Sequence, residues 1–281
     1  MTDTKKTKKA PKKPKQGIVA PRHKIMVIGH RGNSGLLPEN SVNAVASCLD
    51  ESTIDGAEID VQITKDGELI VFHDEDLSRF GGPKARISTL PMAELKKVDY
   101  GVLYNKKFKG VGIATLDDIL SLVPEDSADF LLNIELKISP LLKGEFVKNF
   151  VNRLYMQVDS WIDPRHVLFS SFNWESLDLL RHYSQDMKLG VLTDQPDERG
   201  WISKVKQLSA QYIIVPISKV DKEFETLVKD ELETSILAYT EHHYTDKESE
   251  LNACGKVIQH DIHGLIVNHP LDVYNLIHPQ H

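Results

Sequence analysis

Short runs of β-branched and other apolar residues alternate with longer amphipathic stretches from Lys24 to the end of the chain. Eight of the short runs predict strands, which end near Gly29, Val61, Leu136, Ser170, Val191, Val215, Tyr239 and Val267. Helical spacing of apolar residues lies between most of them, at 41–49, 116–122, 145–155, 174–183, 201–208, 222–229 and around 247–253. Strand–helix alternation favours a parallel sheet, and eight such units predict an α/β fold of the (β/α)8 TIM-barrel type.

One further strand candidate, Leu69–His73, interrupts this alternation. It follows the strand Ala57–Ile63 after a link that contains Asp66-Gly67. The link is too short for a parallel crossover, whereas Asp-Gly suits the turn of a β-hairpin. We therefore predict a short antiparallel hairpin return, which brings the histidine at its end back beside the acidic side chains of the preceding strand.

Residues 75–114 form a stretch without strong periodicity that contains several glycine and aromatic residues. A long irregular segment within a compact domain is usually functional. Because it follows His73 directly, we expect a small insertion that caps the carboxyl end of the barrel. The alternative is a surface excursion packed around a small apolar cluster of its own.

The charge of the chain is divided unevenly between a basic tail and an acidic body. Residues 1–24 hold nine Lys or Arg and a single acid, so the net charge of −7 leaves −15 on the rest. This Lys/Pro-rich tail predicts disorder, because it has almost no apolar side chains to bury. Residues 25–281 predict one large domain, since 41% of the 281 residues are hydrophobic. The tail can simply increase solubility, and attraction to anionic lipid or nucleic acid is the alternative.

Composition disfavours several classes of protein. No apolar run approaches the length of a transmembrane helix, and the basic tail lacks the apolar segment of a secretory signal. Cys48 and Cys254 lie far apart and give neither a disulfide framework nor zinc-ligand spacing. We therefore expect a cytoplasmic protein without a nucleic-acid partner, and the sequence leaves its oligomeric state open.

Two carboxylates stand two residues apart in the second predicted strand, at Glu58 and Asp60. Alternate residues of a strand share a face, so both side chains point the same way. Two buried anions are costly unless a cation pairs with them, which indicates a site for a hard divalent metal with oxygen ligands. For this pair alone, a solvated edge strand is the simpler interpretation.

Polar residues on other strands favour the metal site. Asn133, Glu135 and Lys137 alternate on one face of a buried strand. Glu135 can complete an oxygen site, and Lys137 can hold a phosphate as a point charge. The pairs that end two other apolar strands are His30-Arg31 and His73-Asp74. Charged groups at the carboxyl ends of several barrel strands together indicate an active site.

Five motifs occur in order between Ile28 and about Lys137. They are His30-Arg31-Gly32, Pro38-Glu39-Asn40-Ser41, Glu58-x-Asp60-Val61-Gln62-x-Thr64-Lys65-Asp66-Gly67, His73-Asp74 and Asn133-Ile134-Glu135-Leu136-Lys137. With these motifs and spacings, the chain resembles the glycerophosphodiester phosphodiesterase family. The resemblance is highly specific in this first half and continues more weakly as far as Gly264-Leu265-Ile266.

The resemblance implies a metal-dependent phosphodiesterase on a TIM barrel with an insertion after the second histidine motif. By position, the residues that match the family's metal ligands are Glu58, Asp60 and Glu135. Those that match its acid/base pair are His30 and His73. Those that match its phosphate-binding cations are Arg31 and Lys137. Oxygen ligands suit Mg and Ca equally well, so the metal is one of these two. The sequence leaves open which histidine is the acid, and whether water or the substrate's own 2-hydroxyl attacks.

A few positions depart from the family pattern or surround the motifs. Tyr239 stands where the family often has Trp, and Asn268 where it usually has Asp, which leaves the pocket rim and the alcohol preference open. Glu39 lies close to the first histidine motif and can brace it. Asn40 or Ser41 predicts the N-cap of the first helix. The other ten histidines stand mostly in polar contexts, and we expect them at the surface.

The expected function is the hydrolysis of small-molecule glycerophosphodiesters to an alcohol and sn-glycerol 3-phosphate by His acid/base catalysis. The alternative is a lysophospholipase D-type activity on lipid-like phosphodiesters. A pocket lined by apolar residues of the insertion, such as Phe80, Tyr104 and Phe108, would favour this alternative. A different kind of protein, a non-catalytic binding barrel, is a further alternative. The loss of one of the motif histidines or carboxylates would indicate it, and the sequence retains all of them.

Overall fold

The computed structural model describes residues 24–124, 129–244 and 246–279, so the basic tail lies almost entirely outside the described residues. Eight parallel strands form the barrel: β1 (Met26–Gly29), β2 (Gly56–Ile63), β5 (Leu131–Leu136), β6 (Leu168–Ser171), β7 (Lys188–Leu192), β8 (Tyr212–Pro216), β9 (Ser235–Tyr239) and β10 (Gly264–Val267). Pairing of β1 with both β2 and β10 closes the barrel. The predicted (β/α)8 fold is therefore confirmed.

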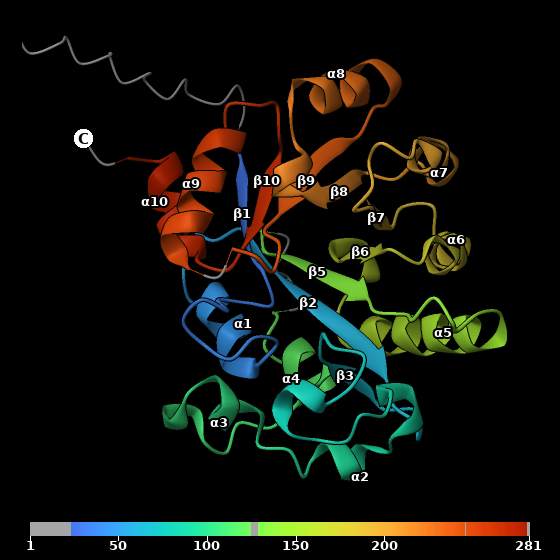
Figure 1. The fold of residues 1–281 in the computed structure, drawn as a ribbon. Coiled ribbons are helices and arrows are strands. Elements are labelled where there is room, and N and C mark those ends of the chain that lie inside the picture. Colours follow the sequence, from blue (N-terminus) through green and yellow to red (C-terminus); the bar gives the residue numbers. More distant parts are fainter. Residues whose placement is uncertain (1–23, 125–128, 245, 280–281) are drawn as a thin grey trace, which may run out of the picture.

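A helix follows each barrel strand before the next one begins, and these helices surround the sheet (Figure 1). They are α1 (Val42–Leu49), α4 (Leu116–Leu120), α5 (Glu145–Asp159), α6 (Trp174–Tyr183), α7 (Gly200–Leu208), α8 (Lys222–Glu231), α9 (Lys247–Val257) and α10 (Pro270–Ile277). The helix α10 was not predicted from the sequence pattern, although Pro270 at its first turn is a typical helix start.

The inside of the barrel is apolar on one side and acidic on the other. The strands β1 and β6–β10 contribute a buried apolar cluster, Ile28, Leu168, Leu192, Ile214, Leu237 and Ile266. On β2 and β5 the corresponding buried positions include Glu58, Asp60 and Asn133. A much larger apolar cluster fills the space between the sheet and the outer helices. Most of the apolar core lies between the sheet and the helices. The inside of the barrel can therefore hold charged groups without loss of this main core.

The predicted antiparallel return is present. The strand β3 (Leu69–Val71) pairs antiparallel with Val61–Ile63, and the backbone N–H of Phe72 donates to the carbonyl of Asp60 at 2.8 Å. Gly67 has φ +87°, the left-handed conformation that glycine adopts most readily. The hairpin therefore sets His73 at the level of the acidic residues of β2.

We expect the variant Gly67→Ala to lower the free energy of unfolding by about 1–2 kcal/mol, because alanine is strained at a positive φ. Urea denaturation of the purified protein measures this change. The matched control is Gly112→Ala, where an added methyl group meets open space and φ is not positive. Equal stability of the two variants would contradict this account of the turn.

Residues 75–114 form a set of short helices with a small apolar core of their own. The helical segments are Ser78–Phe80, Ile87–Thr89, α2 (Met92–Leu95), α3 (Tyr100–Tyr104) and Lys106–Phe108, followed by β4 (Ala114–Thr115), which pairs with β3. The phenol of Tyr100 donates to the carbonyl of Glu39 at 2.6 Å, and the phenol of Tyr104 to the carbonyl of Ser34. These bonds join the segment to the loop that follows β1.

None of the helices in the described part of the chain combines the length and the apolar character of a membrane span.

Candidate active site

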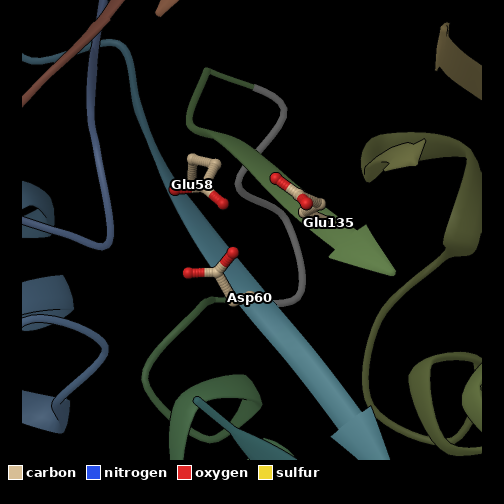
Figure 2. Close-up of side chains that lie close together, drawn as sticks. All are labelled: Glu58, Asp60 and Glu135. Carbon is tan, nitrogen blue, oxygen red and sulfur yellow. The ribbon is translucent and has the colours of Figure 1, made fainter. Parts of the chain in front are cut away.

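Three carboxylates from two neighbouring strands meet inside the barrel. Glu58 and Asp60 come from β2, and Glu135 comes from β5, where it pairs in register with Asp60. Each offers an oxygen, and these three oxygens lie within 4.8 Å of one another. Figure 2 shows the three side chains gathered between the two strands. The structure therefore brings the three predicted metal ligands together.

The carboxylate of Glu58 is only partly satisfied by protein groups. Its Oε2 accepts a hydrogen bond from the backbone N–H of Arg31 at 2.9 Å, while its buried Oε1 has no hydrogen-bond partner among the described residues. Burial, followed by the charges of Asp60 and Glu135, raises the pKa of Glu58 well above its usual value. A buried oxygen without a partner beside two further carboxylates fits a bound divalent cation.

Asp60 is held in place by the loop that precedes α1. The side-chain N–H of Asn40 donates to Oδ2 of Asp60 at 2.8 Å. The Oδ1 of Asn40 accepts a hydrogen bond from the backbone N–H of Asp60 at 3.1 Å. The Nε of Arg31 lies 3.2 Å from the same Oδ2. Burial alone would raise the pKa of Asp60, but Arg31, followed by His73, Lys137 and the hydrogen bond from Asn40, together outweigh burial and hold the pKa below its usual value. Asp60 is therefore an anion at neutral pH.

Lys137 extends the acidic cluster with a positive charge. Its Nζ lies 2.9 Å from Oε1 of Glu135 and 3.7 Å from Oδ1 of Asp60. Burial tends to lower the pKa of Lys137, but Glu135 and Asp60 together raise it above its usual value. The ammonium group is therefore charged.

The guanidinium of Arg31 lies between two acidic residues. It forms ion pairs with Asp60 and, at 3.2 Å, with Oε1 of Glu39. Arg31 itself has φ +55°, an uncommon value for a residue with a side chain. Glu39 therefore contacts the first histidine motif, as predicted, through an ion pair with Arg31.

His30 is oriented by the loop after β10. Its Nδ1 lies 3.0 Å from Oδ1 of Asn268, which also accepts from the hydroxyl of Ser34 at 3.1 Å. Its Nε2 lies 4.0 Å from Oε2 of Glu58. Burial and the charge of Arg31 lower the pKa of His30 well below 6.5. Asn268, one of the two positions that depart from the family pattern, therefore contacts a histidine of the site directly.

His73 has a different partner. Its Nδ1 lies 2.9 Å from Oδ1 of the adjacent Asp74, and Arg79 holds the same carboxylate with Nε at 2.7 Å from Oδ2. Arg79 belongs to the segment 75–114 and also pairs with Glu39. An imidazole that donates from Nδ1 to a fixed acceptor presents its Nε2 to the cavity.

Three further residues that contact the predicted site residues were not assigned to the site from sequence. The ring of His242, expected at the surface, meets the ring of His73 edge-on with centroids 5.0 Å apart. Asn40 was a candidate N-cap, but Ser41 caps α1 and Asn40 binds Asp60 instead. Asp74 was seen only as part of a motif. For His242, the one sequence signal was the histidine-rich stretch after β9.

We expect Asn40→Ala to weaken divalent-metal binding about 10- to 100-fold, because Asp60 loses both amide contacts that orient it. Isothermal titration with Mg or Ca measures the change. The adjacent variant Ser41→Ala is the control, since it removes the N-cap of α1 and should cost about 1 kcal/mol of stability without a comparable loss of metal affinity. Unchanged metal affinity in Asn40→Ala would refute the assignment.

The predicted residues line one central cavity of about 180 Å³. Those on its wall are His30, Arg31, Glu58, His73, Glu135 and Lys137. Asp60 does not line the cavity itself but pairs in register with Glu135 on the neighbouring strand. The polar wall also includes Asn133 and Ser170, hydrogen-bonded to each other at 2.8 Å, together with Tyr239, Thr240, Glu241 and His242. The imidazoles of His30 and His73, two cations and a carboxylate cluster around one space suit the transfer of a phosphoryl group.

Comparisons with known proteins agree with this geometry. The Glycerophosphoryl diester phosphodiesterase family matches residues 30–272. A glycerophosphodiester phosphodiesterase of Caldanaerobacter subterraneus subsp. tengcongensis is 35% identical over 169 residues, which cover 60% of this chain and 67% of that protein. One from Bacillus altitudinis is 36% identical over 175 residues, covering 61% and 69%.

Solved structures share the fold. The phosphodiesterase of Oleispira antarctica in complex with sn-glycerol-3-phosphate has a TM-score of 0.76 at 24% identity, with 90% of this chain and 96% of that chain covered. The glycerophosphodiester phosphodiesterase of Thermotoga maritima has a TM-score of 0.64 at 25% identity, covering 92% and 100%. By its match over residues 30–272 and its curated relatives, the chain belongs to the glycerophosphoryl diester phosphodiesterase family of enzymes.

Proposed function

We propose that this enzyme hydrolyses glycerophosphodiesters to an alcohol and sn-glycerol 3-phosphate with the help of a divalent metal. The observation that carries the proposal is the buried carboxylate cluster of Glu58, Asp60 and Glu135 beside two oriented histidines in one cavity. The fold relative from Oleispira antarctica was solved with sn-glycerol-3-phosphate, which supports this product class.

Glu58, Asp60 and Glu135 would hold the metal. A divalent cation bound there would neutralise the phosphodiester and help to orient it. The all-oxygen ligand set fits both Mg and Ca, and we propose one of these two ions. The unpartnered Oε1 of Glu58 supports the site, because a cation would give this buried atom a partner.

His30 and His73 would transfer the protons. One imidazole takes the proton of the attacking oxygen, and the other gives a proton to the departing alkoxide oxygen, so that the displacement is balanced without free hydroxide. Both rings are anchored through Nδ1, by Asn268 and by Asp74, which supports a role for each Nε2. The attacking oxygen belongs to water or to the 2-hydroxyl of the glycerol.

Arg31 and Lys137 would bind the phosphate oxygens. Both charged groups line the central cavity beside the histidines. Arg31 can present two N–H groups to two oxygens, whereas Lys137 acts as a point charge. Their pairing with Glu39, Asp60 and Glu135 holds the two cations in place before substrate binds.

The remaining proposals concern the whole chain. We propose a single catalytic domain over residues 25–281 with an insertion at about 75–114. Two free, buried cysteines, Cys48 and Cys254, support a reducing, cytoplasmic location. The proposed partner is a small-molecule diester and no nucleic acid.

The test is a panel of glycerophosphodiesters, including glycerophosphocholine and glycerophosphoethanolamine, assayed with Mg, with Ca and without metal. We expect release of sn-glycerol 3-phosphate from at least one diester, dependent on one of the two ions. Lack of turnover of every diester under all three conditions would overturn the proposal.

A further inference from the structure

One arginine of the insertion contacts two carboxylates that come from different loops. Arg79 lies in the short helical segment Ser78–Phe80, which follows the hairpin β2–β3. Its Nε donates to Oδ2 of Asp74 at 2.7 Å, and its Nη2 donates to Oδ1 of the same carboxylate at 3.0 Å. The same Nη2 also donates to Oε1 of Glu39, in the loop after β1. A single guanidinium therefore joins the two loops.

The two carboxylates lead to different groups of the active site. Nδ1 of His73 lies 2.9 Å from Oδ1 of Asp74. On the other side, Nη1 of Arg31 lies 3.2 Å from Oε1 of Glu39. One of these two groups is a proposed proton-transfer residue, and the other is a proposed phosphate-binding cation. Arg79 itself is not among the residues that line the central cavity, so any effect on the reaction passes through its two carboxylates.

The insertion holds the guanidinium of Arg79 in place. Its Cζ lies 4.4 Å from the centroid of the Phe80 ring. The Phe80 ring packs in turn against Phe72 and Tyr100, with centroids 5.4 Å and 4.7 Å apart, in the insertion's own apolar cluster. Tyr100 also donates to the carbonyl of Glu39 at 2.6 Å. The insertion therefore fixes both the arginine and one of its two acceptors.

An arginine suits this position better than a lysine. Asp74 and Glu39 are partly buried anions, which need a cation between them. A planar guanidinium donates to both carboxylates at once, whereas the ammonium of lysine is a single point charge. The side chain of Arg79 is 49% exposed, so a small cation from solvent can take its place once the side chain is removed.

We propose that Arg79 is a positioning residue, which orients one proton-transfer group and one phosphate-binding cation at the same time. It orients His73 through Asp74. It orients Arg31 through Glu39. The inference rests on the proposed function, because the two oriented groups have their roles in that reaction. It gives the insertion a part in catalysis that its apolar cluster alone does not explain.

The first experiment measures kcat and KM of Arg79→Ala with glycerophosphocholine. We expect kcat to fall by about 100-fold, because a small displacement of a catalytic group has an effect of this order, and we expect KM to rise. Guanidinium chloride at millimolar concentration, far below denaturing amounts, should restore most of the lost activity, while KCl at equal ionic strength should not. Arg79→Lys should stay well below wild type, because the ammonium cannot make the fork.

Double variants test the two routes separately. If Arg79 acts through Asp74, then Arg79→Ala combined with Asp74→Asn should lower kcat no further than the more damaging single variant. If it also acts through Glu39, Arg79→Ala combined with Glu39→Gln should show the same non-additivity in KM. Residues that act independently would instead give losses that multiply.

The matched control is Arg165→Ala. Arg165 is exposed and forms a similar forked pair with Asp163, but it precedes β6 at the amino end of that strand. This variant should keep the wild-type kcat and KM and should not respond to guanidinium.

Three results would overturn the inference. They are near-wild-type kcat and KM in Arg79→Ala, multiplying losses in both double variants, and a loss of activity that guanidinium does not restore and that accompanies a much lower melting temperature. The last result would show that the arginine only stabilises the fold. Turnover of glycerophosphocholine by the wild type keeps the proposed function in each case, whereas no turnover of any diester by the wild type would refute both.

Discussion

The variants His30→Ala and His73→Ala are each expected to lower kcat by roughly 10²- to 10⁴-fold while the fold is retained. Each removes one of the two groups that move a proton during the displacement. Neither ring contributes to the large core between sheet and helices, so unfolding is not the expected cause. Steady-state assays on glycerophosphocholine, with thermal unfolding measured in parallel, separate the two effects.

The control for both histidine variants is His182→Ala. His182 is exposed on α6, where its Nδ1 lies near the carbonyl of Asp178, and we expect normal turnover from this variant. Near-normal kcat in either His30→Ala or His73→Ala would show that the imidazole concerned does not take part in the chemistry. Loss of activity together with a much lower melting temperature would instead indicate a structural role.

The variant Asp60→Asn is expected to lower the affinity for the divalent metal by more than about 100-fold and to abolish turnover. Of the three carboxylates in the cluster, Asp60 is the one whose anion is best stabilised. Loss of a group that only supports a metal ligand typically lowers metal affinity about 10- to 100-fold, so loss of the ligand's own charge should lower it further. Isothermal titration of metal into wild type and variant measures the affinity. The amide is close to the carboxylate in shape, so the change acts mainly through charge.

The control for this second prediction is Glu145→Gln, which neutralises an exposed carboxylate in the first turn of α5. It should bind metal as the wild type does. If Asp60→Asn kept wild-type metal affinity, the cluster of Glu58, Asp60 and Glu135 would not be the metal site.

Much of the fold could be predicted because local patterns determine it. Each barrel strand is an apolar run of its own, and the Asp66-Gly67 turn needs no distant contact to form the hairpin. The alternation of Glu58 with Asp60, and of Glu135 with Lys137, predicts shared faces for the same reason. Local periodicity failed at α10, where a short helix follows the last strand directly.

The parts of the site that sequence reasoning missed depend on contacts between distant residues. Asn268 lies 238 positions from His30, and no local pattern pairs them. His242 reaches His73 only because the barrel closes. The apolar lining expected from the insertion is likewise different. Phe80 is buried in the insertion's own cluster, and Tyr104 lines a cavity beside His30 and Ser34.

The most direct test of the account follows glycerophosphocholine by ³¹P NMR with the wild-type enzyme, first after exhaustive chelation and then after Mg or Ca is added back. The account predicts no turnover after chelation, and conversion of the diester to sn-glycerol 3-phosphate once one of the ions is restored. An unchanged rate after chelation, or phosphocholine as the product in place of sn-glycerol 3-phosphate, would contradict it.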